Sequence, residues 1–251
     1  MNNEKIKQAA SILLAARQAG SPIAGLGAAA PATEADTWAI QREVLAGLAG
    51  SIGGYKCATP PGMPSSAAIV ALAGIRSAPS NWAVPASQQI GIETEIAVRF
   101  KRDLPARGRD YTLEDVLDAV DAAFPAIELV KSRFTDMRAV TPLENMADNV
   151  AHIGFVHGAD VANWRDFDLK ALKVKQACGG VTQVEKIGGN PSGDPLIPLL
   201  WLVNHLPQFG LHLQAGQIVT TGSTTGLIFV DSHQKVVSSF EGFGEVSVDL
   251  V

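Results

Sequence analysis

The sequence predicts an α+β fold rich in β-strands, with a small helical region at its N-terminal end. Apolar residues recur with helical spacing over residues 4–19 and again after Thr33. Later in the chain, short runs alternate apolar and polar residues with period two and are separated by turn residues. The few helical segments there do not form a regular βαβ array, which indicates a mixed architecture. We therefore divide the chain into a helical subdomain, residues 1–52, and a β-rich domain, residues 53–251.

The composition is that of an ordinary globular protein and excludes several classes of function. Of the 251 residues, 47% are apolar and 18% are charged, enough for a sizeable core. A net charge of -5 without a Lys/Arg cluster argues against a nucleic-acid surface. No apolar run approaches the roughly 20 residues that span a bilayer, and the first residues lack a signal-peptide layout. The only cysteines, Cys57 and Cys178, are expected to be free thiols of a cytoplasmic protein.

Several helix boundaries are marked by capping residues. The first helix is expected to end at Gly20, and Thr33–Asp36 has the pattern of a capping box opening the second. Thr112–Asp115 opens a third helix in the same way. Asp194 is placed as an N-cap, with Pro195 as the first residue of a last helix that ends near residues 209–210.

Between the helical subdomain and the first long strand lies a segment without acidic residues. Residues 57–92 contain five prolines and no Asp or Glu, so we expect a loop-like segment around residues 57–90 that could act as a lid. Just before it, a Gly-Gly pair precedes Lys56 in a short strand. Lys56 is either a surface residue with its ammonium group in water or a desolvated cation with a chemical role.

Two acids share one face of the next predicted strand. Residues 89–100 place isoleucine, valine and phenylalanine on one face and Glu93 and Glu95 on the other. The two carboxylates then stand about 6.7 Å apart along the strand, where they repel unless a cation lies between them. Mg²⁺ or Mn²⁺ is the simplest candidate because both prefer carboxylate oxygen. A solvated strand face that carries unrelated acids is the alternative.

A third acid lies within an apolar strand. Glu128 is the single charged residue of segment 124–130, where a lone acid is costly unless it is paired or bound to a metal. The helix between the two strands suggests a βαβ-like unit that would place Glu128 beside the first two acids. An ion pair with Lys131 or Arg133 is the structural alternative.

Two turns in the C-terminal half have the chemistry to bind an anion. Asn190 to Gly193 form a turn-rich loop before a helix, and backbone amides at a helix N-terminus can bind a carboxylate. Thr221 and Ser223 belong to a hydroxyl-rich turn after a strand. Earlier, His152 and a second histidine flank a short strand, where either can be an ordinary polar residue.

An ordered set of motifs covers nearly the whole chain. They are Ala35-Asp36-Thr37-Trp38-Ala39-Ile40-Gln41, Gly54-Tyr55-Lys56, Ile92-Glu93-Thr94-Glu95-Ile96-Ala97, Arg102-Asp103-Leu104-Pro105, Pro125-Ala126-Ile127-Glu128 with Ser132-Arg133, Ala147-Asp148-Asn149, Gly193-Asp194-Pro195-Leu196, Gln217-Ile218-Val219-Thr220-Thr221-Gly222-Ser223 and Glu241-Gly242-Phe243-Gly244. In this order and spacing the chain resembles the 2-keto-4-pentenoate hydratase and 4-oxalocrotonate decarboxylase family of the fumarylacetoacetate hydrolase superfamily.

The resemblance implies a β-rich catalytic domain, homo-oligomers and a Mg²⁺ or Mn²⁺ ion held by three acids. Those acids correspond to Glu93, Glu95 and Glu128, and Lys56 corresponds to the family's active-site lysine. The implied substrates are small 2-oxo or 2-hydroxy-dienoic acids of aromatic-compound catabolism, with hydration as the leading reaction. Decarboxylation, acylpyruvate hydrolysis and tautomerisation on the same scaffold are the alternatives. Candidate substrate-binding residues are Asn190, Gly193, Thr221 and Ser223.

The chain also departs from the family pattern. The family's lid carries an acid implicated in proton transfer, whereas Met63–Trp82 contains none. His152 follows the Asp-Asn motif where the family has small residues and serine, and we expect it to replace the missing proton carrier. The acid-free lid also favours a different class of function, a catalytically silent subunit that associates with a homologous enzyme.

Overall fold

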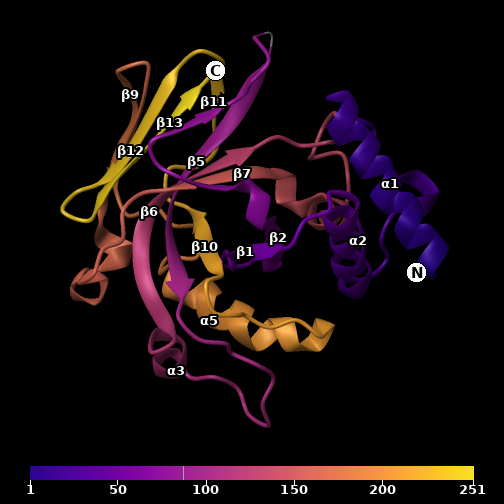
Figure 1. The fold of residues 1–251 in the computed structure, drawn as a ribbon, viewed down its shortest axis with the longest axis horizontal. Coiled ribbons are helices and arrows are strands. Elements are labelled where there is room, and N and C mark those ends of the chain that lie inside the picture. The colour runs from indigo at the N-terminus through magenta and orange to yellow at the C-terminus, as the bar shows by residue number, and fades with distance from the viewer. Residues whose placement is uncertain (87) are drawn as a thin grey trace.

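The structure is a computed structural model that describes residues 1–86 and 88–251 and shows a β-rich body with helices along one side (Figure 1). The helices and strands are α1 (Asn3–Ala19), α2 (Glu34–Gly47), β1 (Ile52–Ala58), β2 (Ser66–Ala71), β3 (Ile75–Ser77), β4 (Ser80–Trp82), β5 (Gln89–Phe100), α3 (Leu113–Leu117), β6 (Val120–Val130), α4 (Pro142–Ala147), β7 (His152–His157), β8 (Lys173–Cys178), β9 (Val181–Ile187), α5 (Leu196–His205), β10 (Ile218–Ser223), β11 (Ile228–Asp231), β12 (Lys235–Phe240) and β13 (Gly244–Leu250). The predicted α+β class is confirmed.

The larger sheet is mixed and has β5 near its centre. Its strand order is β2-β1-β10-β5-β6-β7-β3, with β11 also paired to β5. β5 and β6 run antiparallel, with Glu93 directly opposite Glu128. The predicted βαβ-like unit is therefore wrong: α3 spans five residues only, too short to serve as the crossover that parallel neighbours require. The expected proximity of Glu128 to the other acids arises instead from antiparallel pairing.

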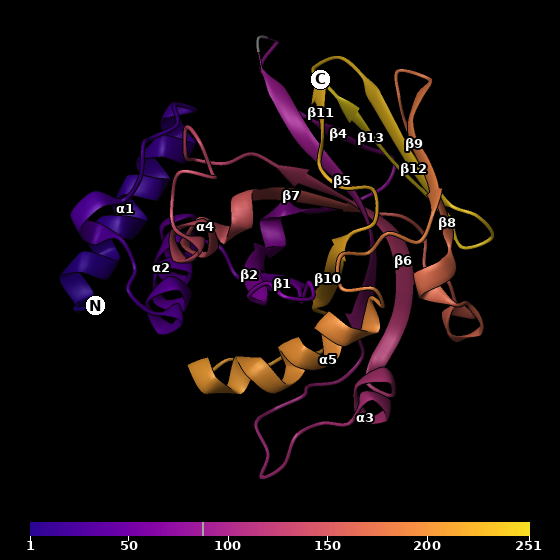
Figure 2. The same cartoon turned by 180° about the vertical axis from the view of Figure 1, so that it is seen from behind.

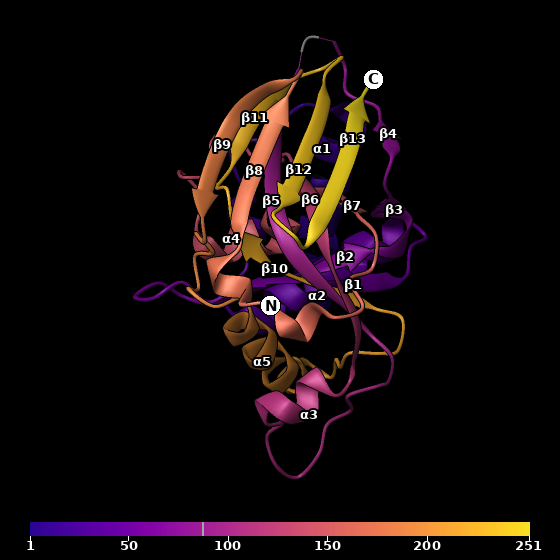
Figure 3. The same cartoon turned by 90° about the vertical axis from the view of Figure 1, so that its left-hand side faces the viewer.

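A second sheet packs against one face of the first. Its order is β4-β13-β12-β8-β9, and Figure 3 shows β8, β9, β12 and β13 in front of β5, β6 and β7. Ile92, Ile127 and Leu129 of the large sheet share one buried cluster with Val236 and Val248 of the small sheet. Period-two alternation thus buries apolar side chains between the sheets and leaves the opposite face of β5 free for its acids.

The helices begin and end as the capping residues predict. Thr33 and Asp36 form a reciprocal capping box at the start of α2, and Gly20 ends α1 in the left-handed conformation. α5 starts one residue later than predicted, although the Asp194 carboxylate still accepts from a backbone N–H of its first turn. Viewed from behind, α1 and α2 lie together on one side and α5 runs beneath β1 and β10 (Figure 2). Within the described ranges, none of these helices has the length and apolar character needed to cross a membrane.

The segment expected to be loop-like is mostly extended. Residues 57–90 contain β2, β3 and β4, and β2 pairs along its whole length with β1. The loop prediction was wrong because the prolines flank these strands, while the core of β2 is the apolar run Ala67–Val70. Residues 59–65 remain without regular structure, and residue 87 of the predicted lid lies outside the described residues.

Candidate metal centre

Three acids from two paired strands form one cluster. Glu93 and Glu95 point from the same face of β5, and register places Glu93 opposite Glu128 of β6. One carboxylate oxygen of each acid lies within 4.8 Å of the others. Glu95 and Glu128 are buried and Glu93 is half-buried. Antiparallel pairing therefore brings three carboxyl groups together, two of them buried.

The cluster fits a hard divalent cation. All three donors are carboxylate oxygens, which Mg²⁺ and Mn²⁺ prefer. The buried Glu128 Oε2 atom has no hydrogen-bonding partner within residues 1–86 and 88–251, although a buried polar atom normally has one. A metal ion would satisfy that oxygen. Glu93, Glu95 and Glu128 are thus the residues we propose as ligands.

Two side chains contact Glu128, one from β1 and one from β7. Lys56 Nζ on β1 lies 2.5 Å from Glu128 Oε1 and 3.2 Å from the Val150 carbonyl oxygen. His152 Nδ1 lies 3.0 Å from the same Oε1 atom. Since an ionised carboxylate only accepts, His152 must donate through Nδ1. The alternative considered from the sequence, an ion pair of Glu128 with Lys131 or Arg133, is not formed; Glu128 pairs with Lys56 and His152 instead.

Glu95 is held by donors from β10. The Thr220 hydroxyl group donates to Glu95 Oε2, and the Gly222 N–H donates to the same oxygen at 3.3 Å. Gly222 has a φ of +99°, which orients this N–H and which an L-residue rarely adopts. A side chain at Gly222 would also crowd Pro191. These contacts fix the carboxylate but leave its charge uncompensated.

Burial and mutual repulsion raise the pKa values of two acids. Burial raises the pKa of Glu93 to about 7, with Lys56 opposing the rise and Glu128 adding to it. Burial, together with the charges of Glu128 and Glu93, raises the pKa of Glu95 to about 8. Burial also acts on Glu128, but Lys56 and His152 outweigh it and hold that pKa below its ordinary value. Without a metal ion, the cluster therefore retains protons near neutral pH.

A left-handed turn presents His152 and the Val150 carbonyl to the cluster. Asn149, Val150 and Ala151 all have positive φ angles of 49–61°, which is strained for residues with a side chain. The buried ion pair between Arg133 and Asp148 anchors this turn, and Arg133 also donates to the His152 carbonyl oxygen. Strain that a buried ion pair maintains next to a charged cluster is typical of a functional site.

A network of hydroxyl groups contacts β5 on the face that packs against the second sheet. The Thr94 hydroxyl group, between the two acids in sequence, lies 2.7 Å from Ser238 Oγ and donates to Gln176 Oε1 at 3.3 Å. The Thr94 N–H donates to Thr225 Oγ1, and the Thr94 carbonyl accepts from the Thr224 N–H. This network ties the strand to the second sheet and thereby positions both carboxylates.

Glu93 and Glu95 line a cavity of about 170 Å³. Lys56 and Ser223, both predicted as site residues, lie in its wall. Asn190 and Thr221 are close to it but have structural contacts: the Asn190 amide donates to the Thr221 carbonyl, and the Thr221 hydroxyl donates to the Ile96 carbonyl. The Gly193 N–H bonds to the Asn190 carbonyl within the turn. Among these four, Ser223 is the one placed to touch a ligand directly.

Several lining residues were not predicted from the sequence. Cys57, Ser66, Ala67, Val150 and Pro191 also form the wall. Small side chains on β2 leave room above the acids, and no local sequence signal marks them. The Gly222 N–H could have been predicted, because a glycine between two hydroxyl residues after a strand indicates a turn of unusual backbone conformation.

Three clustered carboxylates, two of them buried, on a β-rich scaffold define a candidate metal-dependent protein. The family model for the fumarylacetoacetate (FAA) hydrolase C-terminal region matches residues 62–251. The chain therefore belongs to the fumarylacetoacetate hydrolase family, as the ordered motifs indicated.

Two curated relatives are a decarboxylase and a hydratase. A 4-oxalocrotonate decarboxylase of Pseudomonas putida is 31% identical over 182 residues, which are 72% of this chain and 68% of the relative. A 2-hydroxyhexa-2,4-dienoate hydratase of Comamonas testosteroni is 31% identical over 158 residues, covering 63% of this chain and 59% of the hydratase. The alignment thus spans less than two thirds of the hydratase.

A solved structure shares the whole fold. The 4-oxalocrotonate decarboxylase from Pseudomonas putida G7, complexed with magnesium and adipate, superposes with a TM-score of 0.87. The superposition covers 100% of this chain and 99% of the decarboxylase at 23% sequence identity. At that identity the likeness establishes the fold, including the N-terminal helices.

Proposed function

We propose that this protein is a metal-dependent lyase that hydrates small 2-oxo or 2-hydroxy-dienoic acids. The observation that carries the proposal is the cluster of Glu93, Glu95 and Glu128 beside Lys56, with two of these acids and Lys56 lining a cavity of about 170 Å³. The names of its relatives, hydratases and decarboxylases of such acids, support the same substrate class. The family's magnesium-bound structure supports the cofactor, Mg²⁺ or Mn²⁺.

The three glutamates would hold the metal ion, and Lys56 would bind the substrate. A bound Mg²⁺ or Mn²⁺ supplies Lewis acidity that stabilises negative charge on a 2-oxo acid. The pKa of Lys56 is raised, because the charges of Glu128, Glu93 and Glu95 outweigh its burial, so its ammonium group stays charged. A fixed positive charge in the cavity wall attracts the substrate carboxylate and orients the alkene for addition of water.

His152 would act through Glu128 and not on the substrate. It contacts the Glu128 carboxylate but does not line the cavity around the acids. Its Nδ1–H fixes the orientation of Glu128, as a hydrogen bond to a metal-binding carboxylate commonly does. We therefore expect His152→Ala to weaken metal affinity, while unchanged affinity together with lost turnover would favour the role of proton carrier that its sequence position suggested.

Decarboxylation is the second candidate reaction. A specific observation favours it, since a 4-oxalocrotonate decarboxylase is 31% identical over 72% of this chain. Both reactions pass through the same stabilised enolate, so the carboxylate cluster alone does not distinguish them. Release of carbon dioxide from 4-oxalocrotonate would identify a decarboxylase, and consumption of 2-hydroxypentadienoate without it would identify a hydratase. Acylpyruvate hydrolysis and tautomerisation are separated by the same product analysis.

The test of the proposal is a calorimetric titration of Mn²⁺ into metal-free protein, with and without oxalate. Oxalate resembles the chelating end of an enolised 2-oxo acid, so we expect it to strengthen Mn²⁺ binding. Glu95→Gln should abolish this binding, whereas Asp121→Asn, an exposed acid on the same sheet, should leave it unchanged. Absence of Mn²⁺ binding in the wild-type protein would refute the metal centre and favour a catalytically silent partner subunit.

We further propose that the protein is located in the cytoplasm and that it forms a homo-oligomer. Both cysteines are free and buried, as is usual for proteins of a reducing compartment. Light scattering coupled to size exclusion would measure the oligomeric state, with a monomeric mass counting against the proposal.

A further inference from the structure

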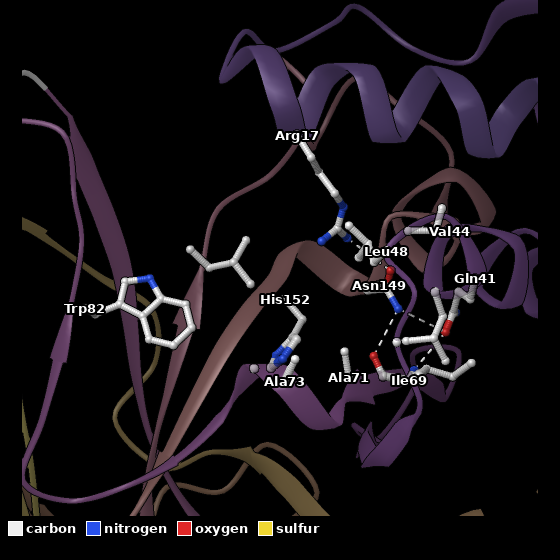
Figure 4. Close-up of a pocket in the computed structure, with 14 residues that line it drawn as sticks. Arg17, Gln41, Val44, Leu48, Ile69, Ala71, Ala73, Trp82, Asn149 and His152 are labelled. Carbon is white, nitrogen blue, oxygen red and sulfur yellow. Dashed lines mark hydrogen bonds between the residues drawn. The ribbon is translucent and has the colours of Figure 1, made fainter.

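A second cavity lies on the other side of His152 from the acid cluster. It has a volume of about 300 Å³ and is formed by α1, α2, β2 and the strained turn before β7. Figure 4 shows Arg17 extending from α1 towards Asn149, with Trp82 facing His152 from the opposite wall. The apolar side chains of the wall include Val44, Leu48, Ile69 and Ile153. A small pocket with an apolar wall and a few convergent polar groups is typical of a small-molecule site.

Arg17 provides a positive charge in this cavity that no acid neutralises. Its guanidinium donates to Asn149 Oδ1 at 3.1 Å, while its buried Nε–H has no partner in the described part of the chain. The nearby carboxylate of Asp148 is already occupied by Arg133, and no acid of residues 1–86 and 88–251 forms an ion pair with Arg17. Burial, reinforced by the charge of Arg133, lowers the pKa of Arg17 to about 10. A partly buried cation whose buried Nε–H lacks a partner gains from an anionic ligand.

The cavity has a second unpaired polar group. His152 is 5% exposed, and its Nε2 atom has no hydrogen-bonding partner in the described ranges. Because Nδ1 donates to Glu128, Nε2 of the neutral ring carries a lone pair that can accept from a hydroxyl group or a water molecule. Two unpaired buried polar atoms in one small cavity indicate a polar ligand more than loose packing.

The approach to the cavity is also positive. An adjoining hollow of about 350 Å³ shares Arg17, Leu48 and Ile153 with it and is lined by Lys131 and Arg133 as well. The Lys131 ammonium group attracts anions towards Arg17, whereas the charge of Arg133 is paired with Asp148.

We propose that the Arg17 cavity binds the carboxylate group of a small organic acid whose apolar body packs against Val44, Leu48 and Trp82. The carboxylate accepts from the Arg17 Nε–H, in a site separate from the carboxylate cluster. Its occupant lies against His152, which links the cavity to Glu128 through one imidazole ring.

The probe is 4-fluorophenylacetate, observed by fluorine NMR during titration of metal-free protein in the presence of EDTA. We expect saturable binding that Arg17→Met weakens at least about tenfold, because a charge-assisted hydrogen bond is lost. Arg17→Lys keeps the charge without the planar Nε–H and should give intermediate affinity. 4-Fluorobenzyl methyl ketone, which lacks the charge, should bind weakly to all three proteins.

Two further variants locate the bound probe. Ala73→Trp at the exposed edge of the cavity should block binding while leaving Arg17 intact. Lys56→Met and Glu95→Gln should bind the probe as the wild type does, because both side chains lie in the other cavity. Loss of binding in Lys56→Met with retention in Arg17→Met would overturn the proposal, as would the absence of saturable binding to the wild-type protein. Urea unfolding of each variant confirms that it is folded.

The carboxylate has two possible sources, a separate organic acid or the far end of a dicarboxylic 2-oxo substrate. Titration of 2-oxoadipate and 2-oxohexanoate into the Mn²⁺-loaded protein distinguishes them. If 2-oxoadipate binds more tightly and Arg17→Met removes the difference, one molecule spans both cavities. Equal affinities identify a separate acid, and the fluorinated probe then binds together with 2-oxohexanoate.

Discussion

Raising the pH should destabilise the metal-free protein, because Glu93 and Glu95 are buried next to each other and to Glu128. The pKa values of the first two are about 7 and about 8 in the folded state, against 4.5 as the ordinary value. A carboxyl group whose pKa is raised by folding favours the native state while it is protonated. This contribution is complete below about pH 4.5 and is lost as the pH rises through 7 and 8.

The size of the effect follows from these pKa values. Between about pH 6 and pH 8.5, deprotonation of Glu95 removes about 2–3 kcal/mol from the free energy of unfolding. Glu93 adds about 1–2 kcal/mol over the same range. The total, about 4 kcal/mol, is a large share of the 5–15 kcal/mol that is typical of folded proteins. Saturating Mg²⁺ should restore the loss, because the ion binds the deprotonated acids of the native state.

Urea unfolding at several pH values, in EDTA and in Mg²⁺, measures this dependence. Glu95→Gln is the matched control, because it keeps the shape of the side chain without its proton equilibrium. Its free energy of unfolding should fall less than that of the wild type between pH 6 and pH 8.5, by about 2–3 kcal/mol. Identical pH profiles for the two proteins in EDTA would refute the assignment of a protonated cluster. A profile that Mg²⁺ does not change would refute a metal site at these acids.

Three other substitutions test how the site is supported. Thr94→Val should lower the free energy of unfolding by about 1–3 kcal/mol and weaken Mn²⁺ binding, because it leaves buried hydroxyl partners unpaired; calorimetry measures both. Arg133→Met should lower the free energy of unfolding by about 3–5 kcal/mol, because it leaves Asp148 as a buried unpaired charge. Urea unfolding measures this change, and a smaller loss would mean that the ion pair does not anchor the turn. Gly54→Ala should prevent folding, because its Cβ would overlap a backbone carbonyl of β10. Gly108→Ala, in open space, should leave the circular dichroism and melting temperature unchanged.

The elements that sequence predicted well are those whose signals are local. The capping box at Thr33 and the alternation through Glu93 and Glu95 depend on neighbours within a few residues, and the structure contains both. The 57–90 segment was mispredicted because its prolines and its lack of acids indicated a loop, whereas β2 is a short apolar run whose strand conformation depends on pairing with β1. Pairing of β1 with β10, which places Lys56 at the cluster, is a long-range contact of the same kind.

At the site, too, residues marked by their neighbours in sequence were predicted, whereas contacts between segments far apart in the chain were not. The three acids were recognisable because each is costly in its own strand, and the motif order connected them. Thr220 and the Gly222 N–H could not be assigned to Glu95 without knowing that β10 lies next to β5. The role of Arg133 was likewise hidden, since its acid partner Asp148 follows it by 15 residues and not by a helical or strand repeat.

Charge balance connects the two cavities. The cluster has three carboxylates and one compensating ammonium group, so it lacks two positive charges when the acids are ionised, and a divalent cation supplies that number. The Arg17 cavity has the opposite imbalance, a guanidinium without an acid. His152 separates the two and contacts Glu128 directly. A molecule with a chelating 2-oxo acid at one end and a carboxylate at the other would neutralise both sites, whereas a monocarboxylate would leave Arg17 uncompensated. The ratio of the affinities for a dicarboxylic and a monocarboxylic 2-oxo acid therefore indicates which of the two the protein prefers as a substrate.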